Sequence, residues 1–218
     1  MEIIRVDDYH DKRFSQKVLF EHGCFLVDDF PYEIEIISDS EAIIRGKDKN
    51  SYQSLIEEFR FYSPHITVFY DNKGDVAERF PKAELFPIAI DYLQPSQFYV
   101  DEQKIKSISS FINKEEDIII QACKINGKYV AIDGHTRLYY AYLKGWKTVR
   151  VIIQNSQQYV NDFVKEAQKR KIFAVKDMKL LKHKQYQEKW YKFCDDYFSS
   201  NERKEWEYEN RYYIKDYA

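Results

Sequence analysis

The sequence predicts an α+β protein of three parts: a small N-terminal α+β domain (residues 1–82), a central domain (residues 83–154) and a C-terminal helical extension (residues 155–218). Three observations support this fold class. Short apolar segments separated by turn residues fill residues 23–46. From residue 86 onward strand-like and helix-like segments alternate, which is typical of a sheet with helices packed on it. Beyond Asn155 the apolar spacing is mainly helical.

The N-terminal domain is expected to be a meander of strands with one helix. Residues 24–27, 32–37 and 42–45 are rich in β-branched and aromatic residues, and DDFP and SDSE separate them as turns. The apolar residues of YQSLIEEF recur at helical spacing, which predicts a helix over about residues 50–61. HITVFYD predicts one more strand. This part carries no phosphate loop, paired carboxylates or metal-ligand spacing, so its sequence indicates no function.

A proline-containing linker, RFPKAELFP, leads into the central domain. We expect IAIDYL to be a strand, QPSQFYV an extended segment and DEQKIKSISSFIN an amphipathic helix. DIIIQACKI and KYVAI are predicted strands joined by a hairpin turn at Asn126-Gly127. HTRLYYAYLK is a predicted helix that ends at Gly145, and KTVRVIIQ is the last strand. Two further helices are expected around Phe163 and Trp190.

Composition narrows the functional classes. The net charge of −2 indicates that the chain as a whole is not built to coat nucleic acid. The three cysteines, Cys24, Cys123 and Cys194, are far apart and fit neither a disulfide framework nor a zinc site, so we expect a reducing, cytoplasmic setting. The first residues lack a signal-peptide core, and no apolar stretch is long enough to span a bilayer. We therefore expect a soluble protein without a membrane partner.

One stretch concentrates chemistry-bearing residues at the joint between a predicted strand and a predicted helix. Asp133 is a good N-cap residue, and Gly134 allows close approach of the backbone to a ligand. The first turn of a helix presents unpaired amides to an anion, and Arg137 could add a bidentate grip. His135 could donate a hydrogen bond or act as an acid or base. The alternative is structural: Asp133 caps, Gly134 turns, and Arg137 pairs on the surface.

A strand followed by DGHTR, a helix ending in GW and a strand KTVRVII resembles the ParB/sulfiredoxin-like superfamily, and LQPSQFYVDEQKIKSI resembles its first conserved box. The resemblance covers about residues 86–154 and includes bacterial ParB-like nuclease domain proteins. It implies a ParB/sulfiredoxin-like fold, in which residues Asp133 to Arg137 hold the phosphates of ATP or another nucleotide with Mg²⁺. Gly134 and Thr136 would supply amides, and Arg137 its guanidinium.

The sequence also departs from the superfamily. His135 stands where sulfiredoxins carry their cysteine, so sulfinic-acid repair is not expected, and His135 is the candidate for a catalytic role. Where the related serine kinases place a catalytic glutamate, this chain has Pro95, Ser96 and Gln97, none of which is a general base. Ser96 and Gln97 remain candidates for ligand contacts. No protein metal site is expected, and the sequence does not decide whether the chain is an enzyme.

Two alternative functions remain open. Residues 165–192 hold ten Lys or Arg against three Asp or Glu, with interleaved aromatics, which could bind DNA through phosphate contacts and stacking. The same pattern fits the solvated side of a helix whose aromatics, Tyr186 and Trp190 among them, are core, and the overall charge favours this interpretation. The third hypothesis is a protein-interaction module that uses the aromatic tail from Trp206 onward.

Overall fold

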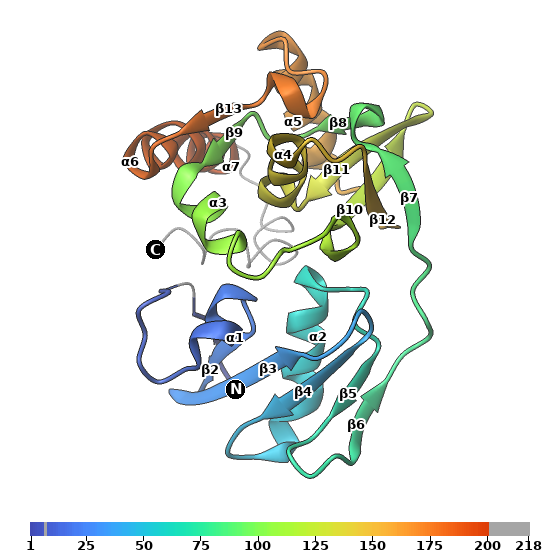
Figure 1. Ribbon diagram of the computed structural model, residues 1–218. Helices are drawn as coiled ribbons and strands as arrows, with labels where there is room; N and C mark the ends of the chain where they lie inside the picture. Colours follow the sequence, from blue (N-terminus) through green and yellow to red (C-terminus); the bar gives the residue numbers. More distant parts are fainter. Residues whose placement is uncertain (7, 201–218) are drawn as a thin grey trace. The chain divides into compact units, whose positions relative to one another are not determined.

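The computed structural model describes residues 1–6 and 8–200 of the 218-residue chain. These residues form two compact units, residues 1–84 and residues 85–200 (Figure 1). The first unit thus ends two residues beyond the expected boundary. The tail from Trp206 onward lies outside the described residues, so the interaction hypothesis stays a prediction. Within the described part of the chain, none of the helices combines the length and apolarity needed to cross a membrane.

The first unit is built on a six-stranded sheet in the order β1-β2-β3-β4-β5-β6. Its elements are β1 (Ile3–Arg5), α1 (Gln16–Phe20), β2 (Cys24–Val27), β3 (Phe30–Ile36), β4 (Glu41–Arg45), η1 (Lys49–Ser51), α2 (Tyr52–Tyr62), β5 (Val68–Tyr70) and β6 (Val76–Arg79). Neighbouring strands are antiparallel except β4 and β5, which are parallel because α2 connects them. The three strands expected in residues 23–46 and the helix after residue 50 are present.

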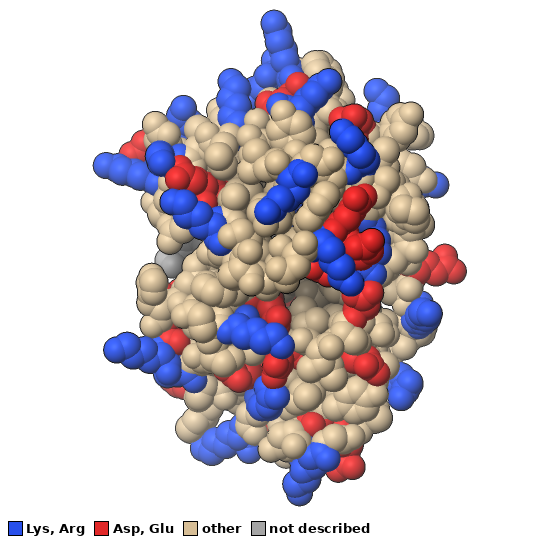
Figure 2. All heavy atoms as spheres, in the orientation of Figure 1, with Lys and Arg blue, Asp and Glu red and all other residues tan. Residues whose placement is uncertain are grey.

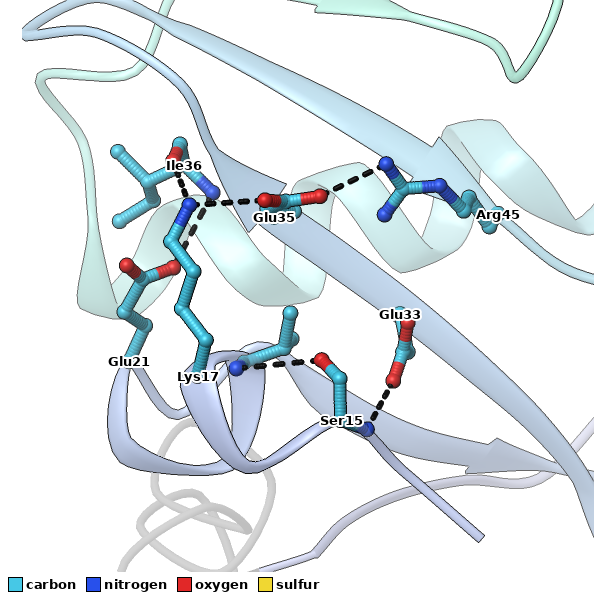
Figure 3. A network of polar contacts seen from close by, with 8 residues as sticks. Ser15, Lys17, Glu21, Glu33, Glu35, Ile36 and Arg45 are labelled. Carbon is cyan, nitrogen blue, oxygen red and sulfur yellow. Dashed lines mark hydrogen bonds and ion pairs between the residues drawn. The ribbon is translucent and has the colours of Figure 1, made fainter.

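Alternation along the strands explains the core of the first unit. Tyr32 and Ile34 of β3 are buried against α2, which contributes Leu55 and Phe59 to the same cluster. The alternating residues of β3, Glu33 and Glu35, carry charge on the opposite face. There Glu35 pairs with Lys17 of α1 and with Arg45 of β4, at 2.8 and 2.7 Å (Figure 3). This network fixes α1 to β3, so its residues have a structural role.

The second unit contains a five-stranded sheet in the order β7-β12-β10-β11-β8 and a two-stranded sheet, β13-β9. The strands are β7 (Phe86–Ala89), β8 (Leu93–Pro95), β9 (Tyr99–Asp101), β10 (Ile119–Ile125), β11 (Lys128–Asp133), β12 (Thr148–Ile153) and β13 (Lys179–Leu181). The helices are α3 (Glu102–Ile108), α4 (His135–Lys144), α5 (Gln158–Lys169), α6 (His183–Tyr186) and α7 (Lys192–Ser200), with short η2 (Ile90–Tyr92), η3 (Glu115–Asp117), η4 (Val175–Asp177) and η5 (Gln187–Tyr191). The expected α+β class is confirmed.

The elements around the DGHTR segment follow their sequence signals closely. β10 and β11 form an antiparallel hairpin, and both turn residues, Asn126 and Gly127, have the positive φ that the Asn-Gly signal predicts. The helix after it covers His135–Lys144 and ends at Gly145, whose φ is +73°. IAIDYL differs from expectation: β7 ends at Ala89, and Ile90 begins the 3₁₀ turn η2.

The C-terminal helices pack into the second unit instead of forming a separate extension. Phe163 of α5 and Trp190 are buried, and the rings of Trp190 and Phe98 meet edge to face at 4.9 Å. β13, which the sequence did not indicate, pairs in parallel with β9. Residues 155–200 therefore belong to the same unit as the DGHTR segment.

Candidate phosphate-binding site

The site begins where β11 passes into α4. The N-cap of α4 is Gly134, not Asp133 as the sequence suggested, and no side chain caps the helix. The first intrahelical bond runs from the amide of Leu138 to the carbonyl of Gly134. No side-chain carboxylate therefore bonds the amides of the first turn, which lie at the positive end of the helix dipole.

Gly134 is required by both its conformation and its surroundings. Its φ is +84°, in the left-handed region that residues with a Cβ rarely adopt. A Cβ at this position would lie 2.9 Å from Cδ1 of Ile120 and 3.1 Å from Nη2 of Arg137. The glycine thus lets the backbone turn tightly under the Arg137 guanidinium.

Asp133 holds Arg137 in place instead of capping the helix. Nη2 of Arg137 donates to Oδ2 of Asp133 at 2.8 Å, and both side chains are partly exposed, Arg137 at 25% and Asp133 at 44%. Gln121, directly opposite Asp133 on β10, donates a longer bond of 3.5 Å to the same oxygen. The guanidinium is therefore positioned over the start of α4 while part of it faces solvent.

His135 is buried, and its ring connects α4 to the segment before β9. Its Nε2 lies 3.2 and 3.3 Å from the backbone nitrogens of Ser96 and Gln97, which donate to it. Because backbone amides can only donate, Nε2 is an unprotonated acceptor and the ring is neutral. Burial lowers the pKa of His135 to about 4, although the negative charge of Asp133 acts in the opposite direction.

The first-box candidates contact protein groups. Ser96 is buried, and its hydroxyl donates to the carbonyl of Ala131 at 2.8 Å. The side-chain Nε2 of Gln97 donates to the carbonyl of Tyr99 and to the hydroxyl of Tyr186. The structure thus brings Ser96 and Gln97 to the predicted loop, through His135. Thr136 lies in the first turn of α4 and is half-buried. Asp101 caps α3 and Glu102 lies in its first turn.

Two residues of the site were missed by sequence reasoning. Gln121 is a buried polar residue inside the run IIIQAC, and that interruption was a usable signal. Tyr186 was counted only as a possible core or stacking aromatic, because its bond to Gln97 joins positions 89 residues apart. Local spacing carries no information about such a contact.

The basic segment, residues 165–192, combines exposed Lys and Arg residues with two buried aromatics, Tyr186 and Trp190. Tyr186 and Trp190 are buried, so they are not available to stack on bases. All ten Lys and Arg residues of the segment are exposed. For Tyr186 and Trp190 this arrangement corresponds to the solvated-face interpretation, and the exposed Lys and Arg side chains are available for phosphate contacts.

No family model and no curated protein match the chain. Similar solved structures include protein Atu1540 from Agrobacterium tumefaciens, 15% identical with a TM-score of 0.32 over 45% of this chain and 63% of that one. They also include sulfiredoxin from Arabidopsis thaliana, 16% identical with a TM-score of 0.29 over 37% of this chain and 96% of that one. The match thus spans less than two thirds of Atu1540. At these TM-scores no property of either protein carries over to this chain.

Proposed function

We propose that residues Asp133 to Arg137 bind the phosphates of a nucleotide such as ATP. The observation that carries the proposal is the start of α4, where Gly134 forms an N-cap without a side chain and the Arg137 guanidinium lies beside it. Free first-turn amides and the helix dipole favour an anion, and a guanidinium can bond two phosphate oxygens at once. The partial exposure of Arg137 leaves it accessible to such a ligand.

In this proposal, Mg²⁺ binds together with the nucleotide phosphates. Among residues 1–6 and 8–200, no group of three or more His, Cys, Asp or Glu side chains could hold a metal ion. A magnesium ion would therefore be held mainly by phosphate oxygens and water, as is common for this ion. Asp133 is a carboxylate of the proposed phosphate-binding loop, and its oxygen already bonds Arg137.

The proposal concerns binding, because His135 is not available as a general base. His135 was the candidate catalytic residue, but its Nε2 already accepts from two amides and its pKa lies well below neutrality. A base needs an available lone pair within reach of the proton it removes. The role that fits His135 is to position the loop, and a catalytic role stays a prediction.

The test is calorimetric titration of ATP, ADP and CTP, with and without Mg²⁺, into the wild type and Arg137→Ala. Loss of charge-assisted bonds predicts that the variant binds at least about tenfold more weakly. Lys144→Ala is the matched control, because it removes one exposed positive charge from the other end of the same helix. Equal affinity of Arg137→Ala and wild type, or no binding by the wild type, would rule out the proposal.

A second candidate, binding of DNA or another polyanion, is favoured by charge distribution. Residues 85–200 contain 19 Lys or Arg against 13 Asp or Glu, an excess hidden by the net charge of −2 of the whole chain. Figure 2 shows Lys and Arg side chains projecting from the part of the surface that holds the C-terminal helices. Binding through such phosphate contacts releases counterions from the DNA, and this release becomes less favourable as the salt concentration rises. The affinity therefore falls with added salt.

The second candidate is tested by the anisotropy of a labelled DNA duplex between about 50 and about 200 mM salt. Lys179→Gln with Lys184→Gln should weaken binding and flatten its salt dependence. Lys182 is left unchanged because it pairs with Glu102. Lys124→Gln with Lys128→Gln, on the β10–β11 hairpin, is the control for the same loss of charge. Equal effects of the two pairs would point to nonspecific attraction.

A further inference from the structure

The segment that contacts His135 is held from its other side by the C-terminal part of the unit. We call residues 94–101 the bridging segment and residues 179–190 the C-terminal arm. β13 of the arm pairs in parallel with β9 of the bridging segment. The amide of Lys179 donates to the carbonyl of Phe98 at 3.0 Å, which extends this pairing by one bond. The backbone of the bridging segment is therefore fixed by the arm.

Side chains reinforce the contact at both ends of β9. At the end near the loop, Nε2 of Gln97 donates to the hydroxyl of Tyr186 at 3.0 Å. Tyr186 is buried, and burial raises the pKa of its hydroxyl, so the group stays neutral. At the far end, Nδ1 of His183 lies 2.6 Å from Oδ2 of Asp101, whose side chain is fully buried.

The same part of the bridging segment faces the predicted loop. The amides of Ser96 and Gln97 donate to Nε2 of His135, and the Ser96 hydroxyl bonds the carbonyl of Ala131 on β11. Gln97 is thus bonded through its backbone to α4 and through its side chain to the arm. A continuous chain of hydrogen bonds runs from Tyr186 through Gln97 to His135, the first residue of α4.

We infer that the C-terminal arm is part of the framework of the residue 133–137 loop, and that Tyr186 is a positioning residue for this loop, acting through Gln97 and His135. The part of this inference that concerns a ligand rests on the proposed phosphate site. The part that concerns the loop does not. A group that fixes the first turn of α4 lowers the cost of ordering that turn when an anion binds.

The experiment compares Tyr186→Phe with Tyr92→Phe in the full chain. Tyr186→Phe removes only the hydroxyl and keeps the ring packing, and Tyr92 is a control because it is 75% exposed in the same unit. The first readout needs no nucleotide: hydrogen exchange of the Ser96 and Gln97 amides, and the ¹⁵N shift of the His135 ring. Loss of one net hydrogen bond predicts about tenfold faster exchange at both amides in Tyr186→Phe.

The second readout is the affinity for ATP with Mg²⁺, which should weaken several-fold in Tyr186→Phe and stay unchanged in Tyr92→Phe. Unchanged exchange and an unchanged His135 shift in Tyr186→Phe would overturn the inference, whatever the affinity does. Faster exchange with unchanged affinity, in a chain that binds ATP, would support the part that concerns the loop and overturn the part that concerns the ligand. Faster exchange in a chain that binds no nucleotide supports the positioning role and removes the proposed ligand instead.

A second variant keeps the test informative if Tyr186→Phe does not fold. Gln97→Met removes the bond to Tyr186, together with the bond to the carbonyl of Tyr99, and keeps a similar side-chain length. It should raise the exchange of the Ser96 amide and shift the His135 ring signal in the same direction. Slow exchange of Ser96 in a folded Gln97→Met chain would contradict the inference.

Discussion

The backbone nitrogen of Ser96 lies 3.2 Å from Nε2 of His135 and donates to it, across 39 positions of the sequence. This bond makes the first residue of α4 an acceptor and ties the start of the helix to the segment before β9. A histidine used in this way must stay neutral, since a protonated Nε2 would face two amide donors without a lone pair. The stability of the fold should therefore depend on pH.

Stability should fall as the pH falls from about 6.5 to about 4, because the pKa of His135 is lowered to about 4 in the folded chain while the unfolded chain takes up its proton near 6.5. The contribution is therefore complete above the unfolded pKa and is lost on acidification. A depression of this size corresponds to at most about 3 kcal/mol in the free energy of unfolding. Urea denaturation across this pH range measures it.

His135→Gln is the control for this dependence, because glutamine offers an acceptor that does not titrate. The variant should be less stable than the wild type at neutral pH, and the difference should shrink as the pH falls. If wild type and His135→Gln lose stability in parallel, other groups cause the acid sensitivity, and the neutral state of His135 is not what maintains the fold.

Gly134→Ala should destabilise the chain more than a glycine substitution at the other end of the same helix. Both Gly134 and Gly145 have positive φ, +84° and +73°, so alanine costs roughly 1 kcal/mol at either position. Only at Gly134 would the new Cβ also meet Ile120 and Arg137, whereas nothing lies within 4 Å at Gly145. Chemical denaturation of the two variants gives the excess cost, which we expect to be about 1–2 kcal/mol.

An equal loss in Gly134→Ala and Gly145→Ala would contradict the close approach of Arg137. A larger loss of stability in Gly134→Ala would show that Gly134 has two roles: it adopts a positive φ, and its lack of a side chain leaves room for Ile120 and Arg137. The second role is the one that the phosphate proposal uses, because the space above Gly134 holds the guanidinium.

Local signals in the sequence predicted the elements of the site well. The Asn126-Gly127 turn, the glycine at position 134 and the helix end at Gly145 each follow from a residue type that a particular backbone conformation requires. The α+β class followed from the alternation of apolar segments. These features depend on neighbours in the chain, so one sequence is enough to find them.

Contacts between distant segments were not predictable in this way. Asp133 was expected to cap the helix, but its carboxylate bonds Arg137, because Gly134 starts the helix one residue later. The β9–β13 pairing and the Gln97–Tyr186 bond join residues more than 70 positions apart. The three-residue strand β13 has too few residues for a period-2 pattern to show.

A carboxylate in the first unit should titrate far below its ordinary range. The Lys49 ammonium beside Asp71 lowers the pKa of that carboxyl to about 2, and the amides of Lys73 and Asp75 donate to its Oδ1 at 2.8 and 3.0 Å. The stabilisation is therefore present above the ordinary pKa of about 3.8 and is lost as the pH falls through about 2. The ¹³C shift of the Asp71 carboxyl, followed against pH, measures the midpoint.

Lys49→Met should move the Asp71 midpoint upward, toward that of an ordinary aspartate. Lys47→Met is the matched control, since Lys47 is two residues away and its ammonium lies over the ring of Phe30. A midpoint that both variants shift equally would mean that the general charge of the loop, not the contact with Lys49, sets the pKa.

Asp133 places a negative charge next to the proposed phosphate. Asp133 bonds Arg137 and is 44% exposed, so its carboxylate both positions the guanidinium and repels an incoming anion. Asp133→Asn removes the repulsion and keeps a side chain that can accept a bond from Arg137. We expect it to raise the affinity for ATP by about three- to tenfold at low salt, an advantage that should fade as ionic strength rises. Titrations at two salt concentrations measure this, with Asp177→Asn, which removes a charge from η4 in the same unit, as the control. Weaker binding by Asp133→Asn would mean that orientation of Arg137 by the carboxylate outweighs the repulsion, and would make Asp133 a positioning residue of the site.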